Sequence, residues 1–300
     1  MSALLGTVLE RDGAVYRVAT ADGQVRAVLR GKAKRDTDRV VVGDRVRLDP
    51  DEGGLYGIVG LEPRVTLLER RVPEGRGTRP IAANIDQVLV VTATAHPAPI
   101  PQLIDRLLVV AEANGIPAGV VVNKVDLDPG TALQERCRRA GYPVYPTSVR
   151  TSQGLDALRQ ALAGRVSVVT GPSGAGKSSL LNAVQPGLQL RTAEISAKVR
   201  RGRNTTVSAV MLPLEGGGFL VDTPGFSEVG LWGVDPGELD DCFPEFRPWL
   251  AQCRYADCRH RSEPGCLVRE ALERGEIDPS RYESYVTLFD ELKSAPEAWE

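Results

Sequence analysis

Alternating apolar and polar residues, interrupted by turn signals, fill the first part of the chain, residues 1–70. Asp-Gly pairs separate the first runs, and Asp-Gly between alternating segments is a strong signal for a β-hairpin. Strands are predicted over residues 4–10, 14–20, 25–30, 40–48 and 55–68. Short strands at this spacing are typical of a small β-barrel, and the OB-fold is the first candidate.

The next part of the chain has a different period. Residues 71–80 carry prolines, glycines and charges without periodicity and are interpreted as a linker. After it, strands are predicted over 87–92, 119–122, 144–147 and 165–170, and helices over 104–113, 133–140 and 155–163. Continuous apolar strands are buried on both faces, and their alternation with helices predicts a parallel sheet, so the fold class is α/β.

Turn residues and cysteines dominate the start of the last part, residues 232–300, and helices are predicted over 267–274 and 282–293. The net charge is −2, so nucleic acid would have to be bound by local basic patches. No apolar run reaches the ~20 residues that a membrane span needs, and we see no secretory leader, so a cytoplasmic protein is expected. Five cysteines without an export signal favour metal binding over disulfides.

A phosphate-binding loop is predicted at residues 171–178, whose sequence GPSGAGKS matches G-x-x-x-x-G-K-[ST] between a buried strand and a helix-prone stretch. Its glycines let backbone N–H groups point at phosphate oxygens, and the following helix N-terminus favours negative charge. We expect Lys177 to reach the β- and γ-phosphates and Ser178 to coordinate Mg²⁺. The loop residues assigned to the nucleotide are Gly171, Pro172, Ser173, Gly174, Ala175, Gly176, Lys177 and Ser178.

A motif that can recognise guanine, NKVD at residues 123–126, directly follows the predicted strand over 119–122. Its aspartate can accept two N–H bonds from the N1 and N2 groups of guanine, whereas adenine offers no such pair and would leave the carboxylate unsatisfied. The Thr-Ser pair after the next strand fits a contact with the base, and an ordinary Ser/Thr turn is the alternative. The residues assigned to the base are Asn123, Lys124, Val125, Asp126, Thr147 and Ser148.

Two later segments are predicted to sense the γ-phosphate. Asp222, at the end of an apolar run, can hold Mg²⁺ through water, and the N–H of Gly225 can contact the γ-phosphate. Thr206, with Thr205 as the alternative, can complete the Mg²⁺ shell only while the γ-phosphate is present. The basic residues around it form either a solvated face or a contact for RNA phosphates; they are Lys198, Arg200, Arg201 and Arg203.

A metal site is predicted in the last part of the chain. Three thiolates and an imidazole make a closed tetrahedral zinc site without a position for catalytic water, so the role is structural. Buried thiols beside a surface histidine are the alternative. Cys137 and Cys242 are expected to be ordinary buried thiols, and His96, in a proline-rich turn, is assigned no role. The predicted ligands are Cys253, Cys258, His260 and Cys266.

The order of the motifs is unusual. In ordinary small GTPases the phosphate loop comes first and N-K-x-D comes late, whereas here NKVD precedes the loop, as a circular permutation would produce. With a β-barrel before and a Cys₃His site after, this order resembles the bacterial ribosome small subunit-dependent GTPases, the RsgA/YjeQ family, over nearly the whole chain. The segments IAANIDQ at residues 81–87 and GPSGAGKSSL at residues 171–180 are also similar to that family.

The resemblance implies an RNA-binding OB-fold over 1–70, a circularly permuted GTPase domain over 81–231 and a helical zinc-binding domain over 232–300. It implies an enzyme that hydrolyses GTP to GDP and phosphate, with stimulation by the small (30S) ribosomal subunit. It also implies binding to that subunit and its 16S rRNA and a role in late maturation of the subunit. The sequence does not indicate an oligomer, so a monomer is expected. Carried over by position, guanine contacts fall on Asn123, Lys124 and Asp126; phosphate and Mg²⁺ contacts on 171–179, including Ser179, and on Thr206 and Asp222; and zinc on the Cys₃His set.

Several positions depart from a usual pattern. The family's switch carries Gly-Arg-His-Thr-Thr, and Asn204 stands at the place of the histidine, where it can position water but cannot take up its proton. Phe226 agrees with the family but follows Gly225 where ordinary GTPases have a water-orienting glutamine. The base loop has Thr-Ser-Val at 147–149 where Ser-Ala is more usual. The sequence therefore predicts slow intrinsic hydrolysis that accelerates when a ribosomal partner orders the switch.

The permutation also suggests how nucleotide state reaches the last domain. The segment after Gly225 runs through residues 226–232 directly into the zinc domain, so loss of the γ-phosphate can act on that domain. Basic side chains at residues 30–35, and Arg254, Arg259 and Arg261 around the metal, are candidate RNA contacts whose affinity should fall with salt.

Two other functions fit parts of the pattern. Guanylate kinases also use a G-P-S-G-x-G-K-S loop, but near the N-terminus and without N-K-x-D. Transfer of phosphate from GTP to GMP, rather than its release, would identify such a kinase. The second alternative is an RNA-binding scaffold that binds GTP with little turnover, which the asparagine at position 204 leaves open. Single-turnover assays with small subunits separate it from a GTPase.

Overall fold

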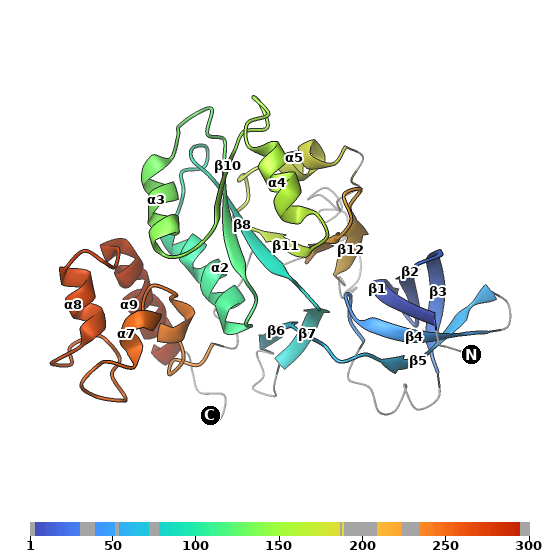
Figure 1. Ribbon diagram of the computed structural model, residues 1–300, viewed down its shortest axis with the longest axis horizontal. Helices are drawn as coiled ribbons and strands as arrows, with labels where there is room; N and C mark the ends of the chain where they lie inside the picture. Colours follow the sequence, from blue (N-terminus) through green and yellow to red (C-terminus); the bar gives the residue numbers. More distant parts are fainter. Residues whose placement is uncertain are drawn as a thin grey trace.

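The computed structural model of the chain describes residues 4–30, 40–51, 54–71, 78–186, 188, 209–223 and 234–294. A β-barrel, a central α/β domain and a group of helices follow one another along the longest axis of the molecule (Figure 1). A β-hairpin lies below the central sheet, between the barrel and the helices. This order along the axis is the order of the sequence, from blue to red.

The barrel is closed by antiparallel pairing of its first strand with its fourth, and its third and fifth strands pair in parallel. The order around it is β1-β2-β3-β5-β4, which confirms the predicted OB-like barrel. The side chains that fill it include Val8, Tyr16, Val18 and Ile58. Its strands are β1 (Leu4–Asp12), β2 (Val15–Thr20), β3 (Gly23–Leu29), β4 (Arg45–Pro50) and β5 (Tyr56–Leu61).

Two predicted strands differ from the structure: the one over 55–68 is divided between β5 and a later strand that begins at Leu67, and the one over 40–48 begins only at Arg45. Residues 40–44 precede β4 as a turn in which the fully buried Asp44 carboxylate accepts the Val41 N–H at 2.8 Å and the Arg64 Nε–H at 2.7 Å. Gly43 in this turn has φ +85°, and a Cβ there would lie 1.9 Å from the Ala83 carbonyl oxygen, so only glycine fits. The valine-rich pattern at residues 40–42 therefore reflects burial rather than a strand.

A two-stranded hairpin of β6 (Leu67–Arg71) and β7 (Thr78–Ala83) connects the barrel with the central domain. The predicted linker over 71–80 thus differs from the structure at both ends, where Arg71 ends β6 and Thr78 begins β7. Asn84, just after β7, donates to the Gly43 carbonyl at 2.8 Å and accepts the Val65 N–H at 2.9 Å. These bonds hold the hairpin against the barrel.

The central sheet has the order β10-β9-β8-β11-β13-β12. It is parallel, as predicted, except for β12, an antiparallel edge strand that the sequence pattern did not indicate. Alternate residues of β8 face opposite sides, as a strand period of two requires: Val88 and Val90 pack in one core cluster, and Leu89 and Val91 in another. The strands are β8 (Gln87–Ala93), β9 (Ala118–Asn123), β10 (Val144–Thr147), β11 (Val166–Thr170), β12 (Val210–Pro213) and β13 (Phe219–Asp222).

Helices cover both faces of this sheet. Helix α2 (Pro101–Ala113) and helix α3 (Thr131–Arg139) contribute to the cluster around Val88. Helix α4 (Leu155–Leu162) and helix α5 (Lys177–Val184) contribute to the cluster around Leu89. This doubly covered sheet places the carboxyl ends of its strands, and the loops that follow them, at one edge of the domain.

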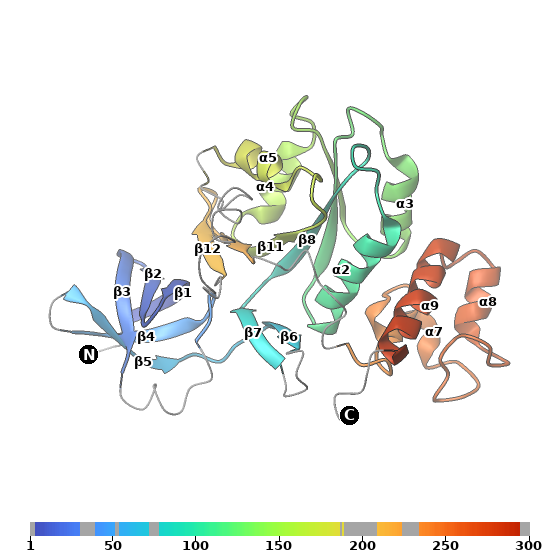
Figure 2. The same cartoon turned by 180° about the vertical axis from the view of Figure 1, so that it is seen from behind.

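The C-terminal helices have their own aromatic core. Phe243 and Phe246 stack with centroids 5.1 Å apart, and Tyr285 meets both rings edge-on. Val109 of α2 belongs to the same core cluster, and α9 lies beside α2 (Figures 1 and 2). The elements are the 3-10 helix η3 (Asp240–Cys242), α7 (Arg247–Leu250), α8 (Leu267–Glu273) and α9 (Pro279–Ser294). Within the described residues, no helix is long and apolar enough to cross a bilayer.

Candidate functional site

The phosphate loop packs tightly against its neighbours. It joins β11 to α5, and Gly171 and Gly176 have φ +139° and +87°. A Cβ on Gly171 would lie 2.0 Å from the Val91 carbonyl oxygen, and one on Gly176 would lie 2.5 Å from the Asn123 side-chain nitrogen. The glycines of the motif are therefore required by the close approach of this loop to β8 and to the base motif.

Lys177 occupies the first helical position after the loop. Its ammonium donates to the carbonyl oxygens of Gly171 at 2.6 Å and Pro172 at 2.9 Å. Burial lowers the pKa of Lys177, because removal from water disfavours the charged form. Carbonyl oxygens carry no full charge, so an anion bound in the loop would stabilise this half-buried cation further.

The base motif is connected to the phosphate loop through Asn123, which ends β9 and is buried. Its side-chain amide donates to the Ala175 carbonyl at 3.0 Å, and its side-chain oxygen lies 3.3 Å from the Thr147 hydroxyl. The structure thus brings together three segments that are far apart in the sequence. They are the loops after β9, β10 and β11.

The carboxylate assigned to guanine is held in place by the next loop. The Ser148 hydroxyl donates to Asp126 at 2.6 Å and accepts the Thr151 N–H at 3.2 Å. Asp126 itself is exposed, whereas Ser148 is buried. The predicted Thr147-Ser148 element therefore lies beside the base motif, where its serine bonds to Asp126 and also accepts the backbone N–H of a Ser/Thr turn.

Lys124 spans the gap between the base motif and the phosphate loop. Its ammonium donates to the Gly174 carbonyl at 2.9 Å and to the His96 carbonyl. Pro97 lies against Gly174, where a Cβ on the glycine would be 3.0 Å from the proline ring. The turn that contains His96 therefore belongs to the surroundings of the site, although no role was predicted for it. A backbone carbonyl leaves no signal in the side-chain pattern.

The residues predicted to bind Mg²⁺ are only partly described. Ser178, like Ser179, lies in the first turn of α5, and Asp222 ends β13, the strand that pairs with β11. These two oxygen donors thus follow neighbouring strands at the same edge of the sheet, which suits a hard cation. The other switch residues lie outside the described residues; they are Asn204, Thr205, Thr206, Gly225 and Phe226.

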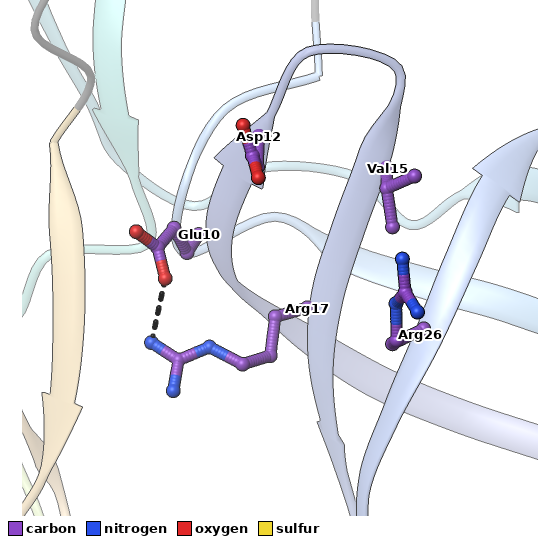
Figure 3. A pocket seen from close by; sticks show the side chains of 5 residues that line it. All are labelled: Glu10, Asp12, Val15, Arg17 and Arg26. Atoms are coloured by element: carbon purple, nitrogen blue, oxygen red, sulfur yellow. Dashed lines mark hydrogen bonds and ion pairs between the residues drawn. The ribbon is translucent and has the colours of Figure 1, made fainter.

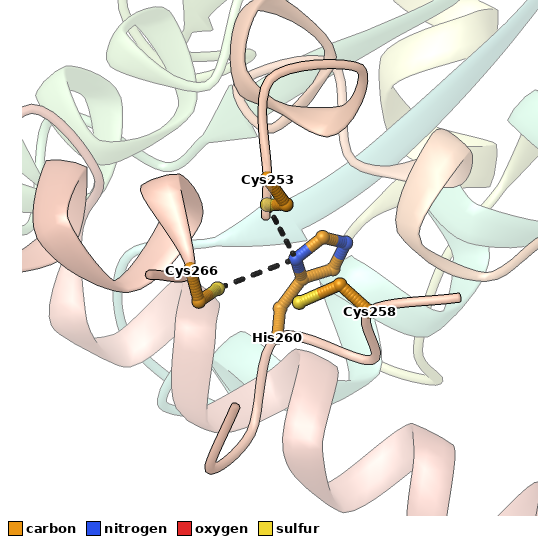
Figure 4. Close-up of side chains that lie close together, drawn as sticks. All are labelled: Cys253, Cys258, His260 and Cys266. Atoms are coloured by element: carbon orange, nitrogen blue, oxygen red, sulfur yellow. Dashed lines mark hydrogen bonds between the residues drawn. The ribbon is translucent and has the colours of Figure 1, made fainter. Parts of the chain in front are cut away.

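The predicted metal ligands converge at one point in the C-terminal helices (Figure 4). The ligand atoms of Cys253, Cys258, His260 and Cys266 all lie within 4.8 Å of one another. The Nδ1 atom of His260 lies 3.6 Å from the Cys253 sulfur and 3.4 Å from the Cys266 sulfur. Three sulfurs and one imidazole nitrogen are the donor set of a closed structural zinc site, and the residues fit such an ion.

Neighbouring groups orient this cluster. The Nε2 atom of His260 lies 3.1 Å from Asp240, so the carboxylate accepts a hydrogen bond from Nε2–H and Nδ1 is left to face the sulfurs. Tyr282 donates to the His260 carbonyl at 2.6 Å, and Tyr285 to the Arg259 carbonyl at 2.9 Å. Asp240 was not predicted from the sequence, because a residue that supports a ligand has no fixed spacing to it.

The other two cysteines are buried free thiols, as predicted. Burial raises the pKa of Cys137 to about 11 and that of Cys242 to about 12. Both thiols are therefore protonated and unreactive near neutral pH.

Two charged surfaces lie outside these sites. On the barrel, Glu10, Asp12, Val15, Arg17 and Arg26 line a shallow pocket (Figure 3), in which Arg17 pairs with Glu10 at 2.9 Å. Near the Cys₃His cluster, Arg261 pairs with Asp290 and Arg259 donates to the Gly237 carbonyl, whereas Arg254 packs on the Tyr255 ring, 5.5 Å from its centroid. Of the basic segment 30–35, the described part is Arg30, which pairs with Asp51.

A phosphate loop and an N-K-x-D motif on one edge of a doubly covered sheet define a P-loop GTPase, and here the strand that carries the base motif precedes the strand that carries the loop. The fold is therefore a circularly permuted GTPase domain with a barrel before it and a metal-binding cluster after it. The family model for the RsgA GTPase matches residues 61–232, and the chain belongs to this family.

Similar proteins match almost the whole chain. A protein of Gemmatimonas aurantiaca named small ribosomal subunit biogenesis GTPase RsgA is 50% identical over 297 residues, which cover 96% of this chain and 97% of that one. A protein of the same name from Moorella thermoacetica is 43% identical over 289 residues, with 96% and 97% coverage.

Solved structures agree with this relationship. YjeQ from Thermotoga maritima is 37% identical with a TM-score of 0.82, covering 97% of this chain and 99% of that one. YloQ, a circularly permuted GTPase, is 28% identical with a TM-score of 0.80, covering 98% and 96%. The predicted family and permutation are thus confirmed.

Proposed function

We propose that this chain binds the small (30S) ribosomal subunit and its 16S rRNA and acts in late maturation of the subunit, hydrolysing GTP to GDP and phosphate when the subunit stimulates it. The names of the similar proteins support the biological role. The observation that carries the nucleotide assignment is the direct connection of the base motif to the phosphate loop through Asn123 and Lys124. We also propose that the chain acts as a monomer in the cytoplasm.

In this proposal, hydrolysis depends on positioning and charge neutralisation rather than on covalent chemistry by the protein. Lys177 donates to the phosphates, and Asp126 accepts hydrogen bonds from guanine. Ser178 and Asp222, with Thr206 as the switch residue, would hold Mg²⁺, which would supply positive charge to the phosphates. Asn204 positions the attacking water by hydrogen bonding, and the N–H of Gly225 contacts the γ-phosphate.

The Cys₃His cluster in this proposal would hold one structural zinc ion. Because the protein supplies all four donors, the ion would take no part in hydrolysis. Its role is to fix the loops that connect Cys253 with Cys266.

The decisive experiment measures GTP hydrolysis by the purified chain with and without isolated small subunits. We expect slow turnover alone and faster turnover with subunits. The variant Asp126→Asn should shift preference from GTP to xanthosine triphosphate, because its amide donates where the carboxylate accepted. Equal turnover with and without subunits would contradict the proposed partner, and equal binding of ATP and GTP would contradict the base assignment.

The RNA-binding scaffold remains an alternative because Asn204 stands at the place of the family's histidine. A single-turnover assay with an excess of subunit-bound chain over GTP distinguishes the two functions. Release of phosphate within the lifetime of the complex identifies an enzyme, whereas release no faster than from the free chain identifies a scaffold.

A further inference from the structure

A cluster of four charged residues lies buried between the C-terminal helices and the central domain, away from the nucleotide and the metal. We call it the junction cluster; its members are Asp105 on α2, Arg136 on α3, Glu245 before α7 and Arg281 on α9. Their side chains are 0%, 8%, 4% and 1% exposed. Two carboxylates and two guanidinium groups balance in charge. Buried charges are rare unless they are paired, so this cluster needs an explanation.

Arg281 is the centre of the cluster. It donates to Asp105 at 2.7 Å and through two nitrogens to the Glu245 carboxylate at 2.6 and 3.0 Å. Its guanidinium also lies 4.6 Å from the centroid of the Phe243 ring. Arg136 donates to the same Asp105 oxygen at 2.9 Å and to the Ser280 hydroxyl at 2.7 Å. Two of these contacts cross between the domains: Arg281 with Asp105, and Arg136 with Ser280. The bonds of Arg281 to Glu245 and of Arg136 to Asp105 each lie within one domain.

The charges in the cluster support one another. Burial alone would raise the pKa of Asp105, but hydrogen bonds from Arg136 and the charge of Arg281 outweigh burial and keep this pKa below its ordinary value. Asp105 is therefore ionised at neutral pH. A buried ionic cluster of this kind restricts movement of the C-terminal helices relative to α2 and α3, because each charged group must keep its partners in one geometry.

The cluster lies between the two functional sites. On one side, α9 carries Tyr282 and Tyr285 next to Arg281, and their hydroxyls hold the backbone of the metal loop at His260 and Arg259. On the other side, α3 with Arg136 follows the base motif in the chain. Described contacts thus join the loop of the Cys₃His cluster to α3, and the chain itself connects α3 to the base motif. This connection is independent of residues 226–232, the covalent route considered from the sequence.

We propose that Arg281 is a positioning residue that fixes the metal-binding domain on α2 and α3 through Asp105 and Arg136, and that this fixed orientation is required for hydrolysis stimulated by the small subunit but not for intrinsic hydrolysis. The statement about stimulation rests on the proposed function. Arg281 touches no residue assigned to the nucleotide, so intrinsic turnover is expected to be unaffected by its loss.

The test compares an apolar replacement of the cluster with an exposed ion pair on the same interface. Arg281→Met alone removes the partner of the buried Glu245 and leaves Asp105 with Arg136 only, so it can unfold the chain. The quadruple variant, which we call the apolar variant, removes all four charges together; it combines Asp105→Leu, Arg136→Met, Arg281→Met and Glu245→Gln. Arg106→Met is the matched control, because Arg106 pairs with Glu291 between α2 and α9 at a site that is 23% and 44% exposed.

The first measurement is hydrolysis with and without small subunits, beside zinc content. We expect the apolar variant to keep its zinc and its intrinsic rate but to lose about tenfold or more of the stimulated rate, a difference of ~1.4 kcal/mol in the barrier. The Arg106→Met control should keep both rates. An apolar variant that retains zinc and full stimulation would overturn the functional part of the proposal.

The second measurement does not depend on the subunit. Spin labels are attached to non-natural ketone side chains at the exposed positions Gln160 and Glu283. Double electron–electron resonance spectroscopy then measures the distribution of distances between the two domains. The unaltered chain should give one narrow distribution, and the apolar variant a broad one. A narrow distribution at the same distance in the variant would overturn the positional role. Absence of stimulation in the unaltered chain, combined with these distributions, would instead contradict the proposed function while leaving the positional role standing.

Discussion

In the proposed nucleotide site, the assigned side chains already have hydrogen-bond partners in the protein. Lys177 and Lys124 donate to carbonyl oxygens of the phosphate loop, and Asp126 accepts a hydrogen bond from the Ser148 hydroxyl. In the metal site, the sulfurs and the His260 Nδ1 atom face one another across less than 5 Å. Thiolates at this separation repel one another unless a cation lies between them. The comparison indicates that protein contacts alone hold the first set of side chains in place, whereas the Cys₃His set would be completed by the proposed ion.

The largest effect should follow removal of the metal. Strong chelation, or Cys258→Ser, should unfold the loops of the C-terminal domain, because structural zinc contributes about 10–16 kcal/mol to the folding of small zinc domains. Guanine nucleotide binding should persist, since no ligand of the cluster contacts the phosphate loop. Circular dichroism and a fluorescent GDP titration measure the two outcomes. Cys137→Ser is the control, and simultaneous loss of nucleotide binding would contradict the separation of the two sites.

Replacement of Lys177 by alanine should have the next largest effect, and only on the nucleotide side. Loss of its charge should lower hydrolysis by about 100-fold or more, by analogy with other preorganised donors to developing charge. The C-terminal domain should keep its zinc and its thermal stability. Arg159→Ala, at an exposed pair with Asp156, serves as the matched cation control. Hydrolysis that survives in Lys177→Ala would exclude the assigned loop as the phosphate site.

On the metal side, Asp240→Asn changes a support rather than a ligand. Asparagine can still accept a hydrogen bond from Nε2–H of His260, but it lacks the negative charge that raises the basicity of the imidazole. Zinc affinity should therefore fall by about 10–100-fold. Competition with a chromophoric chelator measures the affinity. The neighbouring Asp241→Asn is the control, since Asp241 lies beside Arg247 rather than the cluster. Equal loss in both variants would show that the effect is a general one of charge.

Site residues that lie close together in the chain were predicted from the sequence, whereas contacts between distant residues are seen only in the structure. The phosphate loop, NKVD and the Cys₃His set were recognisable because their members lie close together in the chain and their spacing carries the chemistry. Asp240 supports a ligand 20 positions away, and Arg281 meets Asp105 across 176 positions, so neither contact has a local signal.

Among the fold elements, the buried strands and amphipathic helices of the central domain were predicted because one period extends through each of them. The antiparallel edge strand β12 was missed, since four residues at a sheet edge carry too short a pattern. The strand predicted from residue 40 was wrong for residues 40–44. The valines at 40–42 are buried next to the turn that Asp44 stabilises, and burial gives them the composition of a strand.

The smallest predicted effect tests how Ser148 acts on Asp126. If the hydroxyl only orients an acid that already faces solvent, Ser148→Ala should weaken GTP binding by about tenfold or less, because one such hydrogen bond contributes ~1 kcal/mol. It should not admit ATP, since the carboxylate that discriminates the bases is still present. Ser148→Thr should restore most of the affinity by keeping the hydroxyl, and Thr151→Ala, which keeps the backbone N–H that Ser148 accepts, should leave it unchanged. Binding of guanosine and adenosine nucleotides by calorimetry decides between the outcomes: a loss as large as that in Asp126→Asn would mean that Ser148 contacts the base itself.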